Sequence, residues 1–196
     1  MREFIVLGHD APTTPSFSLD DLAGGAGRLD VLCRCLTAAF VRSHGIREDV
    51  RVWLSLRDEL ALRFEGERLR RLNPDERSTA ALVRTALERR DEAVGRVEVE
   101  TTPGVFLSKR DFAAVLDEIE GTLVELHADG DPVVDVDPPA DPAFVLSDHR
   151  DFTDREAALL EDRGDASVRL GPVRLHADQA ITVAHNYLDT DGYRRY

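Results

Sequence analysis

The chain has 196 residues, of which 42% are hydrophobic and 32% are charged. This length and composition favour one globular domain over residues 1–196 and exclude repeat arrays, mini-proteins and disordered chains. The 38 Asp and Glu residues outnumber the 25 Lys and Arg residues, and the resulting formal net charge of −13 argues against a nucleic-acid partner.

The kind of basic residue changes the meaning of this charge. Lys109 is the only lysine, and the other members of the Lys and Arg set are all arginine. An acidic, lysine-poor composition is typical of a halophilic protein, because acidic side chains keep the surface hydrated while molar salt screens charges beyond about 3 Å. The net charge then reflects the solvent, and nucleic acid stays open as a ligand.

The sequence indicates neither membrane insertion nor secretion. No segment approaches the roughly 20 apolar residues that cross a bilayer, and the start of the chain lacks the long apolar stretch of a secretory signal. We therefore expect a cytoplasmic protein that does not use a membrane. Cys33 and Cys35 lie two apart on a predicted helix, so their side chains diverge and we expect free thiols.

The first half of the chain predicts alternating strands and helices. The apolar run at 4–7 suits a buried strand, and apolar positions at helical spacing from 29 to 45 indicate an amphipathic helix. A second helix start is indicated by Asn73 as N-cap, Pro74 in the first turn and Glu76 closing a capping box. The elements predicted here are strand 4–7, a glycine-rich loop at 24–27, helix 29–45, strand 50–56 and a helix from 73.

The second half repeats this alternation. Ser108 is predicted to cap a helix that ends at Gly121, and Thr153 with Glu156 forms a capping box for a helix that ends at Gly164. Strands that alternate with helices favour an α/β layer fold with a mainly parallel sheet. The remaining predicted elements are strands 97–101, 122–127, 144–146 and 167–170 and a last helix over 176–188.

Ligands of an open α/β sheet bind at the carboxyl ends of its strands. Four loops in that position follow Leu7, Leu126, Leu146 and Leu170. The sequence has neither a GxGxxG motif nor a Walker lysine, which excludes a phosphate-gripping P-loop. In the loop at 169–175, Gly171 allows unusual dihedral angles and Pro172 stiffens the exit, so this loop suits a flat, uncharged heterocycle such as adenine.

Histidines after candidate strands allow a metal site as an alternative. They are His9, His127, His149 and His176. A metal-dependent hydrolase would need them to converge, but no HxxxH pair and no cysteine ligand supports this, and imidazoles bonded to backbone or solvent are favoured. We expect no metal. The absence of a GxSxG elbow also disfavours covalent nucleophilic catalysis.

Five sequence motifs together resemble a known family. They are GRLDVLCRCL at 27–36, PDERS at 74–78, LHADG at 126–130, VLSDH at 145–149, and LGP followed by LHAD at 170–178. Their order and spacing are similar to the motif series of the archaeal tRNA pseudouridine-54 N1-methyltransferases, of the SPOUT class. The resemblance covers nearly the whole chain, so it is far more specific than any single motif.

The resemblance implies a SPOUT-type α/β fold, in which helices flank a mainly parallel sheet and the C-terminal segment forms a deep trefoil knot. It also implies a homodimer, a tRNA substrate, and S-adenosylmethionine bound in the knot. The family usually has glycine at the position of Ser147 and cysteine at that of Ala180, and we expect the main-chain contacts to survive both changes. The implied cofactor residues are Leu126, Ser147, Arg169, Leu170, Gly171, Pro172, Val173, Arg174, Leu175 and Ala180.

The implied chemistry is an in-line methyl transfer to a ring nitrogen that must lose its proton. A carboxylate could accept this proton and an arginine could stabilise charge on the ring. The catalytic candidates are Asp30 with Arg28 and Glu76 with Arg77. The alternative for both acids is structural, because the first turn of a helix favours carboxylates.

RNA contacts would come from local arginine clusters, with tyrosines as stacking surfaces. The candidates are Arg68, Arg70 and Arg71, and Arg194 and Arg195 beside Tyr193 and Tyr196. We expect the target nucleotide to be flipped into the pocket. An RNA-binding protein that retains the knotted fold without turnover is the second hypothesis.

Overall fold

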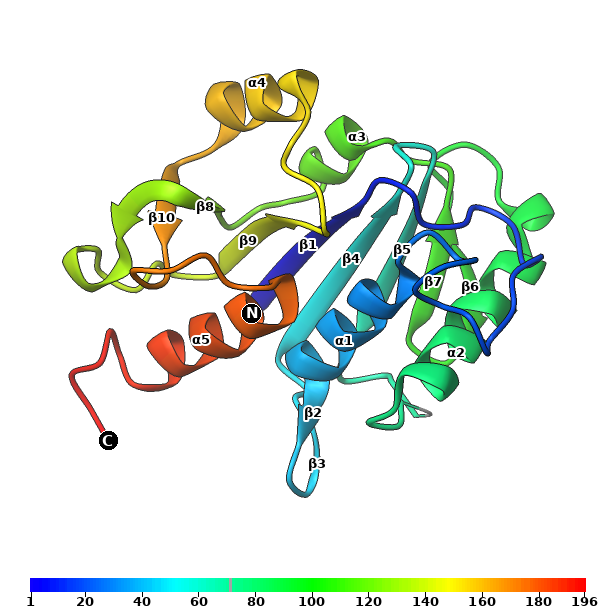
Figure 1. The fold of residues 1–196 in the computed structure, drawn as a ribbon, viewed down its shortest axis with the longest axis horizontal. Coiled ribbons are helices and arrows are strands. Elements are labelled where there is room, and N and C mark those ends of the chain that lie inside the picture. The colour runs from blue at the N-terminus through cyan, green and yellow to red at the C-terminus, as the bar shows by residue number, and fades with distance from the viewer. Residues whose placement is uncertain (71) are drawn as a thin grey trace.

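A computed structural model describes residues 1–70 and 72–196. Its main feature is an eight-stranded sheet with the order β10-β8-β9-β1-β4-β5-β7-β6 (Figure 1). The strands are β1 Arg2–Gly8, β4 Val50–Leu56, β5 Leu60–Glu65, β6 Val99–Thr102, β7 Val105–Ser108, β8 Thr122–Pro132, β9 Pro142–Ser147 and β10 Ala166–Arg169.

The sheet is parallel over β10, β8, β9, β1 and β4, which confirms the predicted mainly parallel α/β class. Strands β5, β7 and β6 are antiparallel additions beyond β4, and sequence reasoning missed β5 and β7. The β4–β5 turn has φ values of 52° at Arg57 and 56° at Asp58. Such a turn usually shows Asn-Gly, so its sequence carried a weak hairpin signal.

Helices cover both faces of the sheet. One core cluster joins α1, α2 and α5 to Phe4 and Val6, while the other joins α3 and α4 to Ile5 and Leu7 of the same strand. This division follows from the alternation of side chains along a strand. The helices are α1 Leu29–Phe40, α2 Glu76–Glu88, α3 Phe112–Leu116, α4 Asp154–Arg163 and α5 Ala177–Asp189, with short 3-10 turns at Arg90–Glu92 and Val133–Asp135.

Several predicted helix ends are wrong. Helix α1 ends at Phe40 instead of at 45, because the chain turns there into the small hairpin of β2 Val41–Arg42 and β3 Gly45–Ile46. Asp75, not Asn73, caps α2, and Asp111, not Ser108, caps α3; each aspartate accepts the backbone N–H three residues further on. The capping box of α4 and its end at Gly164 are confirmed.

Helix α5 packs along α1 through a buried histidine. Nε2 of His185 donates to the carbonyl oxygen of Ala39 at 3.0 Å, and Nδ1 accepts from Arg2 at 3.2 Å. Burial lowers the pKa of His185 to about 4, so the ring is neutral at pH 7 and can fill both roles. The ring also lies edge-on to Phe4, with centroids 5.0 Å apart. This contact connects the C-terminal helix to α1 and β1.

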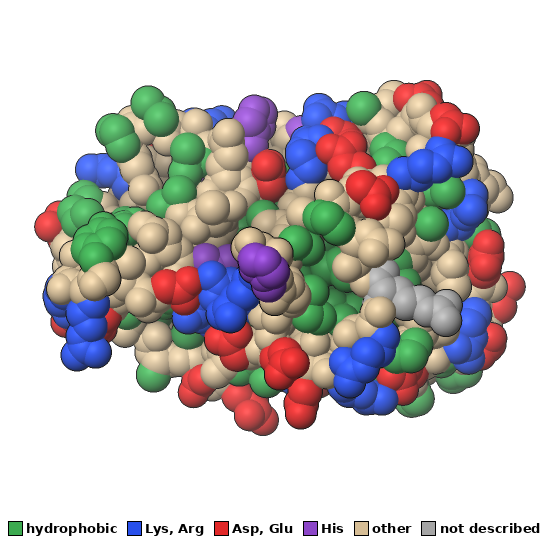
Figure 2. Space-filling model, turned by 90° about the horizontal axis from the view of Figure 1, so that it is seen from below, with side chains coloured by type: hydrophobic (Ala, Val, Ile, Leu, Met, Phe, Trp, Pro, Cys, Tyr) green, Lys and Arg blue, Asp and Glu red, His purple; other side chains and the backbone are tan. Residues whose placement is uncertain are grey.

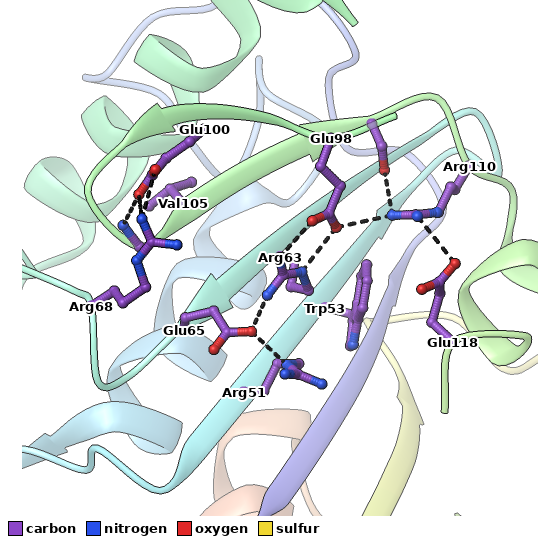
Figure 3. A network of polar contacts seen from close by, with 12 residues as sticks. Arg51, Trp53, Arg63, Glu65, Arg68, Glu98, Glu100, Val105, Arg110 and Glu118 are labelled. Atoms are coloured by element: carbon purple, nitrogen blue, oxygen red, sulfur yellow. Dashed lines mark hydrogen bonds and ion pairs between the residues drawn. The ribbon is translucent and has the colours of Figure 1, made fainter. Parts of the chain in front are cut away.

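The antiparallel half of the sheet carries a cluster of arginines and aromatic rings (Figure 3). The guanidinium of Arg63 lies 4.2 Å from the ring centre of Phe106 and 5.5 Å from that of Trp53. Glu98 accepts from Arg63 and from Arg110, each at 2.9 Å. The arginines thus contact neighbouring carboxylates and aromatic rings, and these contacts stabilise the outer strands.

Within the described ranges, no helix has both the length and the apolar character of a membrane span.

Candidate active site

A cleft of about 590 Å³ opens at the carboxyl ends of β9 and β10 and beside the middle of β8. The first turns of α1 and α5 complete its walls, because α5 lies beside α1 and both helices begin at this edge. The lining residues are 28, 31, 126–128, 146–152, 168–177 and 180. Its volume lies within the range of about 300–1,000 Å³ that is typical of small-molecule sites.

Every residue predicted to bind cofactor lines this one cleft. They are Leu126, Ser147, Arg169, Leu170, Gly171, Pro172, Val173, Arg174, Leu175 and Ala180. Leu126 lies within β8, where the pairing with β10 shifts register, so the predicted strand end at 127 is wrong and β8 continues to Pro132. The segments from β8, β9 and β10 are far apart in sequence and meet here because these parallel strands are neighbours in the sheet. The fourth predicted loop, after Leu7, does not line the cleft, and the contacts of its His9 are described below.

Two residues of the cleft have features that point to a ligand. The backbone of Gly171 is not left-handed, so the residue does not use the conformational freedom that was expected of it from the sequence. A Cβ atom built on Gly171 would meet nothing within 4 Å. What glycine provides here is open space. The hydroxyl of Ser147 is buried and has no hydrogen-bond partner within the described chain, which a ligand atom would satisfy.

Of the catalytic candidates, only Arg28 lines the cleft. It adopts a left-handed conformation, with φ of 61°, directly before α1. Its Nε and Nη2 donate to the carboxylate of Asp30 at 3.0 and 3.1 Å. Asp30 is buried behind Arg28 and also accepts from Arg34 at 2.9 Å. Burial opposes the ionisation of Asp30, but the hydrogen bonds from both arginines outweigh it and lower its pKa.

The second predicted pair lies outside the cleft. Glu76 accepts from Nη1 of Arg34 at 3.1 Å, and Arg77 pairs with Asp20 on the exposed surface. The geometry therefore gives Glu76 and Arg77 no direct access to a ligand in the cleft. Arg34 connects the two motifs through Asp30 and Glu76, and it also lies 3.8 Å from Asp178 of α5. Sequence reasoning missed Arg34, although its i,i+4 spacing from Asp30 was a usable signal.

His9 is held between two carboxylates behind the cleft wall. Its Nδ1 lies 2.9 Å from Oδ1 of Asp148, its Nε2 lies 3.0 Å from Oε2 of Glu156, and its backbone N–H donates to Oδ2 of Asp148 at 2.9 Å. The hydrogen bonds to Asp148 and then to Glu156 raise the pKa of His9 to about 10. The ring is therefore an imidazolium at pH 7, a poor metal ligand.

The four histidines of the alternative metal hypothesis do not all meet at one site. His127, His149 and His176 line the cleft, whereas His9 faces the two carboxylates. Across the residues that the structure describes, no group of three or more His, Cys, Asp and Glu side chains is arranged to hold a metal ion.

The charge of His9 predicts how stability depends on pH. Because folding raises the pKa above its ordinary value of 6.5, the contribution is fully present below pH 6.5 and is lost as the pH rises through about 10. The expected size is on the order of a few kcal/mol. Urea unfolding at pH 7 and pH 10 should show this loss in the wild type and a smaller one in His9→Gln. Equal losses of stability in the two proteins would contradict the raised pKa of His9.

The arginines proposed to contact RNA are mostly paired with acids. Arg68 donates to Glu100 at 2.7 Å, and Arg194 donates to Asp137 at 2.5 Å. Basic and acidic side chains are intermixed in the same way over the face seen in Figure 2. Arg195 lies 3.6 Å from Asp191, and Arg70 donates to the carbonyl oxygens of Glu67 and Leu69. Of the two tyrosines, Tyr193 packs near Tyr187 and Tyr196 is fully exposed. The remaining candidate, Arg71, lies outside the described residues.

The cleft itself is where positive side chains gather. Four arginines line it, and three of them are paired with carboxylates: Arg28 with Asp30, Arg150 with Asp10 and Arg174 with Asp151. Sequence reasoning had missed Arg150, which follows the motif at the end of β9. The fourth arginine, Arg169, instead donates to the carbonyl oxygen of Gly130 at 3.2 Å and pairs with no carboxylate among the described residues, so its charge remains available to an anionic ligand.

The two cysteines are buried free thiols, as predicted. Burial raises the pKa of both Cys33 and Cys35 well above the usual range of a thiol. Neither residue lines the cleft. Both thiols are therefore protonated at pH 7 and serve in packing between α1 and the sheet.

Comparisons with known proteins agree with these features. A family model described as "Putative SAM-dependent RNA methyltransferase" matches residues 1–193. Proteins named tRNA (pseudouridine(54)-N(1))-methyltransferase are 68% identical in Haloarcula marismortui and 67% in Haloferax volcanii, each over 100% of both chains. The protein of that name in Methanocella arvoryzae is 46% identical over 94% of this chain and 97% of its own.

A solved structure shares the fold. It is Archaeoglobus fulgidus Nep1 bound to S-adenosylhomocysteine, with a TM-score of 0.65 at 13% identity, covering 96% of this chain and 97% of the other. At this identity the likeness shows the fold alone. The full-length family match and the close relatives confirm the resemblance seen in the motifs: the chain belongs to the RNA methyltransferase family that its model describes, among relatives named tRNA (pseudouridine(54)-N(1))-methyltransferase.

Proposed function

We propose that this protein transfers a methyl group from S-adenosylmethionine to N1 of pseudouridine 54 in tRNA. The observation that carries the proposal is the convergence of the motif residues from three neighbouring parallel strands on one cleft, in a chain that matches its named relatives over its whole length. Arg169, which lines this cleft and pairs with no carboxylate among the described residues, suits a phosphate of an RNA substrate.

The cleft fits S-adenosylmethionine. Leu126, Leu146 and Leu170 provide apolar walls for a flat base. The buried hydroxyl of Ser147 has no hydrogen-bond partner among the described residues, and a polar ligand atom would supply one. The main chain around Gly171 borders open space, so backbone groups can approach a ligand closely. When bound, the cofactor supplies an electrophilic methyl group. The residues of 169–175 would hold it beside the first turn of α5.

The chain's own residues position the base and stabilise its charge. Arg28 uses Nε and Nη2 to hold Asp30, and Nη1 is the part of the guanidinium that remains to meet a pyrimidine oxygen in the cleft. There it would stabilise negative charge as the ring nitrogen gives its proton to water in the open cleft and accepts the methyl group. Asp30 and Asp148 accept hydrogen bonds on both oxygens, so neither is a free base. Holding the reacting atoms in line then supplies much of the acceleration.

The proposal includes the assembly and setting of the protein. A single domain, a homodimer, a C-terminal trefoil knot and a salt-rich cytoplasm all follow from the resemblance and the composition. The order of elements is compatible with the knot: β10 lies at the sheet edge, and the helix that follows it, α5, packs on α1. Light scattering at high salt tests the dimer directly.

A labelling experiment tests the function. Purified protein is incubated at high salt with S-adenosylmethionine that carries a labelled methyl group and with tRNA that contains either pseudouridine or uridine at position 54. We expect label in the pseudouridine tRNA alone, and full activity in excess chelator. Binding of tRNA without transfer of label would favour the non-enzymatic RNA-binding protein, and loss of activity in chelator would favour a metal enzyme.

A further inference from the structure

One wall of the cleft is a short segment without regular structure between β9 and α4. Residues 148–152 of this segment line the cleft. Asp148 comes directly after β9, and its side chain is only 1% exposed. The shape of this wall therefore depends on what holds Asp148 and the start of α4 in place.

His9 holds both ends of this segment. Its ring bonds to Asp148 on one side and to Glu156 of α4 on the other, and its backbone N–H donates to Asp148 as well. Glu156 in turn accepts the backbone N–H of Thr153 at 2.7 Å, and Asp148 accepts that of Arg150 at 3.0 Å. One side chain of the β1 loop thus fixes the segment at its beginning and at its end.

The charges around His9 explain why a cation is needed there. Asp148 and Glu156 face the ring, and replacing it with a neutral group would leave two largely buried carboxylates without a shared cation. His149 lies 3.4 Å from both Asp148 and Asp10, and Arg150 pairs with Asp10. The other charged groups of the small cavity beside His9 are Arg57, Asp58 and Arg155.

We propose that His9 is a positioning residue, whose ring joins Asp148 to Glu156 and so keeps residues 148–152 in the shape that binds the methyl donor. The inference rests on the proposed function, because it gives this wall a role in binding that donor. His9 does not line the cleft, so its effect on a ligand passes through the wall.

The variant His9→Gln tests the proposal. An amide cannot donate to both carboxylates and carries no charge, so the wall should loosen. We expect the Kd for S-adenosylhomocysteine, measured by calorimetry, to rise about tenfold or more. The methyl donor's KM should rise while kcat changes little. Loss of folded protein alone would instead lower the number of sites and kcat at an unchanged Kd.

Arg155→Gln is the matched control. Arg155 is next to Glu156 on α4 and ties the same helix to Asp58 and Asp111, outside the cleft. We expect its Kd to stay within about twofold of the wild type, as for an exposed ion pair. An unchanged Kd in His9→Gln, or an equal rise in Arg155→Gln, would overturn the proposal.

Hydrogen exchange separates this proposal from the proposed function. Amides of 148–153 should exchange faster in His9→Gln than in the wild type, while those of β4 stay protected, with or without ligand. If the wild type fails to bind S-adenosylhomocysteine, the proposed function fails, yet faster exchange in His9→Gln would still show that His9 holds residues 148–152 in place. Unchanged exchange at 148–153 would overturn this positioning role of His9.

Discussion

Gly171→Val should abolish binding of S-adenosylhomocysteine and leave the fold intact. The new side chain meets no atom of the described chain within 4 Å of its Cβ, and the backbone at this position is not left-handed, so the substitution causes no internal clash. Gly171 lines the cleft, and a branched side chain there occupies space that the ligand needs. We expect an affinity loss of about 100-fold or more, since close backbone approach is no longer available.

A graded series makes this result specific. Gly171→Ala adds one methyl group and should weaken binding less than Gly171→Val, while both variants keep the wild-type circular dichroism spectrum and unfolding midpoint. Calorimetry on the three proteins measures the affinities. Wild-type affinity in Gly171→Val would remove this loop from the binding site.

Asp30→Asn should lower the methylation rate more than the cofactor affinity. The amide keeps the shape of the carboxylate but loses the charge that Arg28 and Arg34 share. Arg28 is then no longer fixed at the cleft, and we expect the rate to fall about 10- to 100-fold. Because Asp30 is buried between these arginines, the free energy of unfolding should also fall by about 2–4 kcal/mol.

Glu76→Gln is the control for this prediction. Glu76 pairs with the same Arg34 but is half-exposed and lies outside the cleft. Its loss should cost less than about 1 kcal/mol and change the rate little. Rates measured at saturating cofactor, with urea unfolding of both variants, decide the matter. A rate loss in Glu76→Gln equal to that in Asp30→Asn would return Glu76 to the catalytic candidates.

Sequence reasoning succeeded where the signal is local. The capping box of Thr153 and Glu156 predicted the start of α4, because both bonds lie within one turn. The short apolar stretches at 4–7 and 50–56 similarly predicted strands β1 and β4. The caps of α2 and α3 were wrong because several polar residues near each start could serve, and only the backbone path selects Asp75 and Asp111.

The amino-acid sequence by itself determined the class of fold, the family and the loops that meet at the cleft. These depend on hydrophobic periodicity and on ordered motifs, which are properties of short stretches. Only the tertiary structure decided that Arg28 reaches the cleft while Glu76 and Arg77 do not, and that His9 meets Asp148, 139 positions away. The physical reason is that ion pairs between distant segments depend on the order of strands in the sheet, which no local pattern encodes.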